Sequence, residues 1–287
     1  MHQMGGETLT LILNIGYIVS TLSFVALGLV IIFGRLGVMN MAHGEFLTIG
    51  AYAMVAVQAA GLPLIWGIPL SILVTSLVGL ALQAAIVRPL ADRPLDTLLA
   101  TWGGSILLRE LVEAIFGRQY QSISSDWVRT IDLFGTPYPA YRLMLMAVVL
   151  VLMAGLIVIY KTTSVGARLQ AAVSNPVLAA AAGINVARQT QMAFVIGAAS
   201  TGLAGALLAP LVRIEPFMGM DYLLNSFFVM VVGGLGSLIG LVAGSAVIGG
   251  TQTIVSTFFD QTMGYSAVLV LSILFLWRRP NGLFPYR

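Results

Sequence analysis

Long apolar stretches alternate with short polar breaks along the chain, and this pattern predicts helices that cross a membrane. A helix needs about 20 predominantly apolar residues to cross a hydrocarbon core about 30 Å thick. Such stretches cover residues 8–33, 46–60, 63–87, 97–116, 143–160, 192–211, 222–259 and 263–277, of which 222–259 is interrupted by glycines. The pattern therefore predicts an all-α fold, a polytopic transmembrane helix bundle with about eight to nine spans and broken or re-entrant helices, in a single domain over residues 1–287.

The composition agrees with this pattern. The chain is 59% hydrophobic and 9% charged, with a mean hydropathy of +0.97, whereas soluble domains carry about 25% charged residues. There is no cysteine, which excludes disulfides and thiol chemistry. The net charge of +3 does not indicate a nucleic-acid partner, because in a membrane protein the positions of Lys and Arg matter more than their sum. No basic region and cleavage site precede the first stretch, so we expect Thr8 onward to form a mature span.

One polar segment, residues 161–188, stands between two apolar stretches and carries the signals of a short helix. Ser174 or Asn175 can cap a helix start, and Pro176 suits the first helical position, where its missing N–H costs nothing. Gly183 can adopt the left-handed conformation that closes a helix. The sequence therefore predicts a helix from Pro176 to the residue before Gly183. It is either an ordinary interfacial helix or one that takes a mechanical push from a soluble partner.

The positions of the basic residues predict how the chain crosses the membrane. Lys161 and Arg168 place the polar segment in the cytoplasm, because cytoplasmic loops carry an excess of Lys and Arg. If the C-terminus is also cytoplasmic, residues 222–259 must return to the side they came from, as a hairpin or re-entrant pair, and the N-terminus lies outside. The cytoplasmic side then holds Arg35, Arg88, Arg93, Lys161, Arg168, Arg188, Arg278, Arg279 and Arg287, and the outside holds Arg118, Arg129, Arg142 and Arg213.

Three charged residues fall inside one predicted span, residues 97–116. Each charge near a helix centre costs about 2.5–3.5 kcal/mol on insertion scales, so Arg109, Glu110 and Glu113 need partners or water. Arg109 and Glu113 are four residues apart and share a helix face, so we expect them to neutralise each other. The alternative is that these side chains snorkel toward the headgroups.

Two apolar regions are interrupted by glycine and polar residues, residues 34–50 and residues 233–250. Broken helices at membrane depth are tolerated where they line a cavity or are buried in protein, and paired breaks in the two halves of a chain point to a translocation site. The first break holds an amide, an imidazole and a carboxylate that can line a polar conduit or, alternatively, form a cytoplasmic turn. With only two histidines in the chain, we expect no metal site. The candidate path residues are Asn14, Asn40, His43, Glu45, Arg109, Glu110 and Glu113, and the second break is at Gly233, Gly234 and Gly236.

The chain shows no arrangement typical of an enzyme. We find no nucleophile paired with a base, and the only histidines are His2 and His43. There is no phosphate-binding loop of the GxxxxGK[ST] type. We therefore expect no catalytic residues, no bound cofactor and no ATP hydrolysis by this chain, and a transporter or channel rather than an intramembrane enzyme.

Four segments, taken in order, resemble one family. GVMNMAHGEFLTIGAY resembles the first signature of the LivH/LivM-type permeases of bacterial ABC importers, and GARLQAAVSNPVLAAAAGINV resembles their cytoplasmic coupling segment. GLAGALLAP followed by VVGGLGSLIGLVAGS, and the closing RPNGLFP, are similar to later family segments. The resemblance covers nearly the whole chain. It implies an inner-membrane importer subunit that works with a second permease, two ATPase subunits and a periplasmic substrate-binding protein.

The resemblance also implies a mechanism. ATP and Mg²⁺ used by the partner ATPases would drive alternating access by pushing the short helix of the coupling segment, residues 161–188. The loops at residues 117–141 and 213–221 would be docking sites for the binding protein. The residues expected to couple the chain to the ATPase are Gly166, Arg168, Asn175, Pro176 and Gly183.

Within the family, RPLDTLLATWGGSILLRELVEAIFG and PYPAYRL look most like the urea permeases of the UrtB type. The resemblance therefore predicts urea as the substrate. The alternative is a branched-chain amino acid or a short amide, because an amino acid zwitterion would use a charge pair such as Arg109–Glu113. A different class remains open too, a proton-coupled secondary transporter or passive channel that uses Glu45, Glu110 or Glu113.

Overall fold

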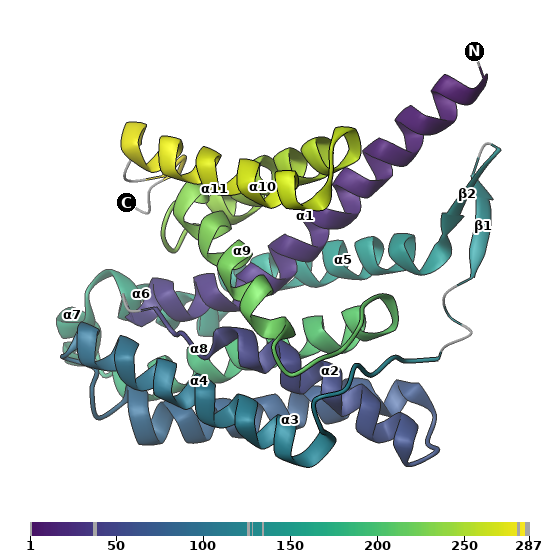
Figure 1. Cartoon of the computed structure of the whole chain (residues 1–287). Coiled ribbons are helices and arrows are strands. Elements are labelled where there is room, and N and C mark those ends of the chain that lie inside the picture. The colour runs from purple at the N-terminus through teal and green to yellow at the C-terminus, as the bar shows by residue number, and fades with distance from the viewer. Residues whose placement is uncertain are drawn as a thin grey trace.

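The computed structural model describes residues 2–36, 39–124, 127, 129–133, 135–279 and 282–284, and in this part of the chain nearly all elements are helices (Figure 1). The longer helices are α1 (His2–Leu36), α2 (His43–Ala59), α3 (Gly67–Leu82), α4 (Pro94–Phe116), α5 (Ala140–Thr162), α6 (Ser164–Ser174), α8 (Val186–Leu208), α9 (Met218–Gly233), α10 (Leu238–Phe258) and α11 (Gln261–Arg278). The short ones are α7 (Pro176–Ala181), the 3₁₀ turns η1 (Leu64–Trp66) and η3 (Ala209–Leu211), and the π-helical turn η2 (Gln83–Val87).

The bundle is built around α8, which packs against α1, α2 and α3. Small residues bring these backbones together. A Cβ atom added at Gly50 of α2 would lie only 2.0 Å from the carbonyl oxygen of Gly202, and one added at Gly205 would lie 2.0 Å from the carbonyl oxygen of Leu47. Close approach of this kind is how helices associate in lipid, where apolar burial alone gives no driving force.

The stretch predicted to break at glycines is a helical hairpin, so the prediction that it turns back is confirmed. α9 ends at Gly233 and packs against α10, which begins at Leu238. Gly234 and Gly236 in the turn have φ angles of 116° and 77°, where a side chain is disfavoured. The C-terminal segment closes this turn, because the N–H groups of Leu283 and Phe284 donate to the carbonyls of Val232 and Gly233, both over 2.9 Å.

Six helical segments of the described residues are long and apolar enough to cross a membrane, which shows a polytopic helical membrane protein. They are Gly6–Gly34, Leu64–Val87, Ala140–Thr162, Val186–Leu211, Leu238–Phe258 and Gln261–Arg278. The prediction of eight to nine spans counted more, because it included three other helices. α2 and α9 are short, with 17 and 16 residues, and α4 carries the charged residues already noted. The all-α fold class is confirmed, and the loop between α4 and α5 additionally forms a short antiparallel hairpin of β1 (Thr130–Leu133) and β2 (Thr136–Pro139).

The two ends of the bundle differ in structure (Figure 1). At one end the β1–β2 hairpin lies beside the start of α1, where Thr136 contacts Gly6. Gly34 of α1, Gly166 of α6 and Gly236 of the α9–α10 turn line one apolar cavity of about 130 Å³ at the other end. In the view of Figure 1, α6, α7 and the C-terminal end of α11 all lie on the left, as the prediction of the chain's path requires.

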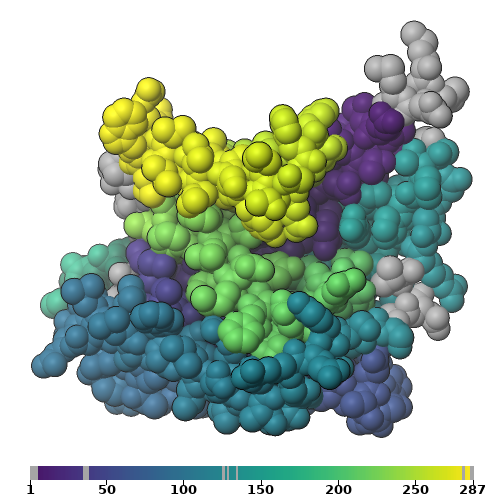
Figure 2. All heavy atoms as spheres, viewed as in Figure 1, coloured from purple at the N-terminus to yellow at the C-terminus, as the bar shows by residue number. Residues whose placement is uncertain are grey.

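One long face of the molecule is formed by α3 and α4 on one side, α9 in the middle, and α10 and α11 on the other (Figure 2). Large apolar side chains are exposed on the outer helices of this face, among them Leu107 of α4 at 62% and Ile273 of α11 at 57%. Exposed apolar surface of this extent is what a lipid-facing helix needs and what a water-facing helix avoids.

Candidate translocation site

Helix α2 begins inside the bundle rather than at its end. Its first residue, His43, is fully buried, and its Nε2 lies 3.0 Å from the carbonyl oxygen of Val25. Val25 stands nine residues before Gly34, the end of the first candidate span, and nine residues extend about 14 Å along a helix. The start of α2 therefore lies about 14 Å before the end of the first candidate span, in the interior of the bundle.

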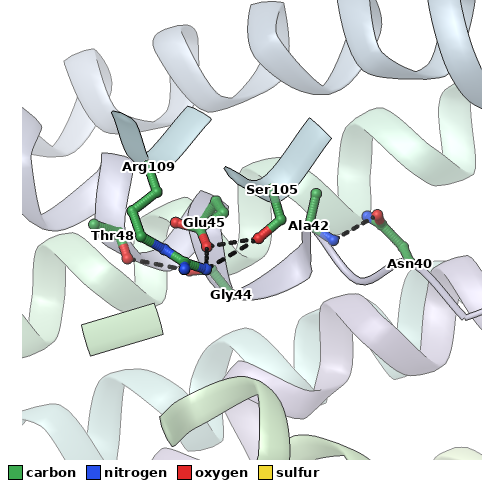
Figure 3. Close-up of polar contacts among 7 residues, drawn as sticks. All are labelled: Asn40, Ala42, Gly44, Glu45, Thr48, Ser105 and Arg109. Atoms are coloured by element: carbon green, nitrogen blue, oxygen red, sulfur yellow. Dashed lines mark hydrogen bonds and ion pairs between the residues drawn. The ribbon is translucent and has the colours of Figure 1, made fainter. Parts of the chain in front are cut away.

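A buried ion pair stands at this start. Arg109 Nη2 of α4 donates to Glu45 Oε1 in the first turn of α2 over 2.7 Å, with side chains only 10% and 3% exposed (Figure 3). Ser105 joins them, because its hydroxyl donates to the same carboxylate oxygen over 2.8 Å and accepts from Arg109 over 3.2 Å. The Phe217 ring lies 4.9 Å from the guanidinium carbon, at cation–π distance. The three polar side chains thus form one neutral cluster at the middle of α4.

The predicted pairing of Arg109 with Glu113 is wrong. Glu113 instead accepts from Arg118, which follows the end of α4 and folds back onto it, and this hydrogen bond raises the pKa of the Arg118 guanidinium. Glu110 is exposed on α4. The spacing along α4 showed that Arg109 and Glu113 share a face of the helix. It could not show that α2 brings the carboxylate of Glu45 closer to Arg109. Arg109 therefore does not snorkel toward the headgroups.

Residues 39–42, before α2, form a turn in which Asn40 and Ala42 are buried. Asn40 is 2% exposed, and its Oδ1 accepts from the Ala42 N–H over 3.1 Å. The Met41 N–H donates to Thr101 Oγ1 of α4 over 3.2 Å. His43 caps nothing, and no side chain caps the α2 N-terminus. The structure therefore brings Asn40, His43 and Glu45 into the bundle interior, as a conduit requires.

Several polar atoms at this start have no hydrogen-bond partner among the described residues. They are Asn40 Nδ2, His43 Nδ1, Glu45 Oε2 and Arg109 Nε, each inaccessible to solvent. Buried polar atoms are rarely left unpaired in native proteins, so this cluster has capacity for water or a polar ligand. No group of three His, Cys, Asp or Glu side chains converges among the described residues, and the absence of a metal site stays a prediction.

Asn14, also predicted to lie on the path, is elsewhere. Its Oδ1 accepts from Arg142 Nη1 over 3.1 Å and from the Tyr138 hydroxyl over 3.3 Å. These partners belong to the start of α5 and to β2, at the end of the bundle that carries the hairpin. Asn14 ties that end together and takes no part in the Glu45–Arg109 cluster.

An apolar groove of about 270 Å³ lies between α2, α3 and α4, next to the ion pair. Its lining includes Ile49, one turn after Glu45 on α2, and Leu108 and Val112, which flank Arg109 on α4. Sequence analysis missed this groove, because the pattern along each helix does not show how far neighbouring helices stand apart.

The polar segment folds as its punctuation predicted. α7 spans Pro176–Ala181, Asn175 Oδ1 accepts from the Leu178 N–H over 2.9 Å, and Gly183 has a φ of 82°. The predicted helix was one residue too long, since Ala182 is the C-cap. Arg168 is exposed, and Leu178 is 67% exposed.

The first half of that segment forms a second helix, α6, which the sequence analysis did not predict. Thr163 caps it by accepting from the Gly166 N–H over 3.2 Å. α6 folds back onto the end of α5, so a Cβ atom at Gly166 would lie 2.1 Å from the Tyr160 carbonyl oxygen. The T-x-x-G spacing was the signal that could have located its start.

Comparison with known proteins identifies the family. Residues 11–277 match the model of a family described as the branched-chain amino acid transport system permease component. The chain belongs to this family. It is therefore a permease component of an ABC transport system and not itself an enzyme, and membership implies ATPase and binding-protein partners.

Individual relatives agree over nearly the full length. The chain is 27% identical over 280 residues to the high-affinity branched-chain amino acid permease protein LivH of Salmonella typhimurium, covering 92% of this chain and 91% of that protein. It is 26% identical to BraD of Pseudomonas aeruginosa over the same shares. The structure of PsaBC from Streptococcus pneumoniae in complex with Fab is similar with a TM-score of 0.51 and 13% identity, over 96% of this chain and 93% of that chain. At that identity the last likeness shows the fold alone.

Proposed function

We propose that the chain is the permease subunit of a binding-protein-dependent ABC importer for branched-chain amino acids. The observation that carries this proposal is the family match across residues 11–277, together with relatives named as branched-chain amino acid permeases over about nine-tenths of both chains. Urea, the substrate that the sequence resemblance favoured, has no support from these relatives. The proposal therefore adopts the alternative substrate.

The buried ion pair supports an amino acid over urea on physical grounds. An amino acid zwitterion carries an ammonium and a carboxylate, which a path through low dielectric must match with opposite charges. Glu45 and Arg109 supply both charges inside the bundle with no net charge. Urea is neutral and would need only amide and hydroxyl groups. For a urea path, burying the two charges would cost desolvation energy that no charge on the substrate offsets.

The assembly we propose has two permease subunits, alike or homologous, two ATPases and a periplasmic binding protein, in a bacterial inner membrane. The end with α6 and α7 faces the cytoplasm, and the N-terminus and the β1–β2 hairpin lie outside. α2, α4 and α9 lie within the membrane with the six longer spans. The loops around the hairpin and at residues 213–217 bridge to each other through Gln121 and Ile214, which gives the binding protein one continuous surface.

Coupling in this proposal runs through α7. ATP and Mg²⁺ bind to the partner subunits and not to this chain, and closure of the ATPases pushes on the exposed side chains of Val177 and Leu178. The capped ends at Asn175 and Gly183 keep α7 helical under that load. Arg168, exposed beside it, pairs with an acidic rim of the ATPase.

The proposal is tested by reconstituting the complex in proteoliposomes and measuring ATP-driven accumulation of labelled leucine. We expect accumulation with ATP on the ATPase side and none when the phosphate-binding lysine of the partner ATPase is replaced by alanine. Accumulation that persists in the ATPase variant and requires a proton gradient would instead establish the proton-coupled class. Accumulation of urea without leucine would overturn the substrate.

A further inference from the structure

In the ion pair between α2 and α4, only one nitrogen of Arg109 and one oxygen of Glu45 bond to each other. Arg109 Nη2 and Glu45 Oε1 hold each other over 2.7 Å, and Ser105 binds that same carboxylate oxygen. Arg109 Nε and Glu45 Oε2 remain without partners among the described residues, although both are buried. A donor on a permanent cation and an acceptor on an anion are therefore left without partners within the same ion pair.

An apolar groove lies along the same two helices, with residues near Glu45 and Arg109 in its lining but not these two residues themselves. Ile49 follows Glu45 by four residues and shares its face of α2, and Leu108 and Val112 flank Arg109 on α4. All three line the groove of about 270 Å³ between α2, α3 and α4. An apolar cavity of about 150 Å³ is enough to bind benzene, so the groove has room for a branched aliphatic side chain.

We propose that the unpartnered atoms of the Glu45–Arg109 pair and the groove beside it form a binding site for an aliphatic amino acid within the membrane. The substrate ammonium donates to Glu45 Oε2, the substrate carboxylate accepts from Arg109 Nε, and the side chain enters the groove. This inference rests on the proposed function, and it adds a site and a mode of recognition that neither the family nor the relatives' names assign.

Charge matching favours this occupant over a lipid chain. A zwitterion adds no net charge to a pair that is itself neutral, and each end meets the opposite charge in a low-dielectric environment. An acyl chain in the groove would leave Arg109 Nε and Glu45 Oε2 unpaired, which is costly for buried charged groups.

The absence of cysteine in the chain allows a direct test with single-cysteine variants of the assembled importer in membranes. Ser105→Cys places a thiol beside the pair, and Ile49→Cys places one in the groove. The probe is a small cationic methanethiosulfonate reagent, and the readout is the rate of modification of this chain during ATP turnover. Leucine and urea are each added as protectant.

We expect both thiols to react and leucine to slow the reaction about tenfold at ten times its Kd, as occupancy dictates, with no slowing by urea. Asp92→Cys, in the loop before α4, should react at a rate that leucine does not change. Ser272→Cys, on α11, is as buried as Ser105 but belongs to neither the ion pair nor the groove, so it should stay unreactive throughout.

The inference is overturned if the Ser105→Cys and Ile49→Cys thiols never react, which would indicate a sealed pair and a lipid-filled groove. It is also overturned if they react equally with and without leucine. Labelled-leucine uptake by the same complexes separates the two proposals. If leucine is taken up but does not protect the thiols from modification, the proposed site is wrong and the proposed function is unaffected. If the wild-type complex takes up no leucine, the proposed function is wrong.

Discussion

Glu45 and Arg109 are separated by 64 residues in sequence and joined by a 2.7 Å hydrogen-bonded ion pair between α2 and α4. α4 packs mainly against α2 and the η2 turn, so few other contacts hold it to the bundle. Since lipid is as apolar as the α4 surface, polar contact and close packing must hold such a helix in place. The pair therefore fixes the position of α4 against α2.

Breaking the pair by removing one partner should destabilise the protein strongly. Glu45→Gln leaves the Arg109 charge buried without a counter-ion, which typically costs about 3–5 kcal/mol. We expect a large fall in Tm in detergent for this variant. The exchange Glu45→Arg with Arg109→Glu should recover part of the loss, because the pair is restored although the anion leaves the α2 N-terminus.

Glu110→Gln is the matched control, because Glu110 adjoins Arg109 but is exposed. Its effect should stay within about 0.5 kcal/mol. Equal losses for the Glu45 and Glu110 variants would contradict a stabilising role of the pair.

The sequence predicted that Arg109 needs a partner, but not which residue that partner is. The cost of charges in a span correctly indicated that Arg109 needed a partner, and the polar break correctly singled out Glu45. Pattern along one helix could only offer the nearest carboxylate, Glu113. Glu45 can reach Arg109 because α2 starts inside the bundle. This start is seen only in the structure, where His43 Nε2 lies beside the Val25 carbonyl oxygen of α1.

The glycine contacts between α2 and α8 should be sensitive to a single methyl group. At Gly50 an added Cβ meets the Gly202 carbonyl oxygen at 2.0 Å, so Gly50→Ala must push the helices apart, at a cost of about 1–3 kcal/mol or more. Gly103→Ala on α4 has open space within 4 Å and should stabilise its helix by up to about 1 kcal/mol. Thermal unfolding gives the change in Tm for each variant. A similar fall in Tm for Gly50→Ala and Gly103→Ala would contradict tight α2–α8 packing.

Gly183 should matter for coupling rather than for insertion. Its φ of 82° makes Gly183→Val unfavourable by about 1–2 kcal/mol at the end of α7, while no atom outside the adjoining residues lies within 4 Å of the Cβ position. We expect normal membrane insertion and ATP hydrolysis, but fewer leucine molecules moved per ATP.

Gly183→Asn is the matched variant, because Asn tolerates this conformation. It should restore most of the transport per ATP, which is measured as the ratio of uptake to hydrolysis in proteoliposomes. Full coupling in the valine variant would remove the requirement for a closed α7 end.

The polar segment, residues 161–188, is the region where the sequence predicted the local structure most fully. Asn175, Pro176 and Gly183 act locally, through backbone conformation and one capping bond, so their pattern alone predicted α7. For α6 only the start is signalled locally, by Thr163, whereas its position depends on the close approach of Gly166 to the Tyr160 carbonyl of α5.

The C-terminal segment should stabilise the α9–α10 turn. At Gly282, with a φ of 78°, an added Cβ would lie 2.4 Å from the Gly234 Cα, whereas Gly135 has a φ of 83° and open space around it. Gly282→Ala and Gly135→Ala both pay the left-handed penalty of about 1–2 kcal/mol, but only the first must also displace a backbone.

We therefore expect a clearly larger fall in Tm for Gly282→Ala, with faster amide exchange at Leu283 and Phe284, whose N–H groups donate to α9. Equal falls for the two variants would mean that the segment does not hold the turn.

The proposed function is tested most directly by competition for uptake. Cells that express this permease with its partners are given labelled leucine at low concentration, with unlabelled leucine, isoleucine or urea in excess. The proposal predicts that leucine and isoleucine abolish uptake and that urea leaves it unchanged. Labelled urea uptake that excess leucine does not affect, with no leucine uptake above that of cells lacking the permease, would contradict it and return urea as the substrate.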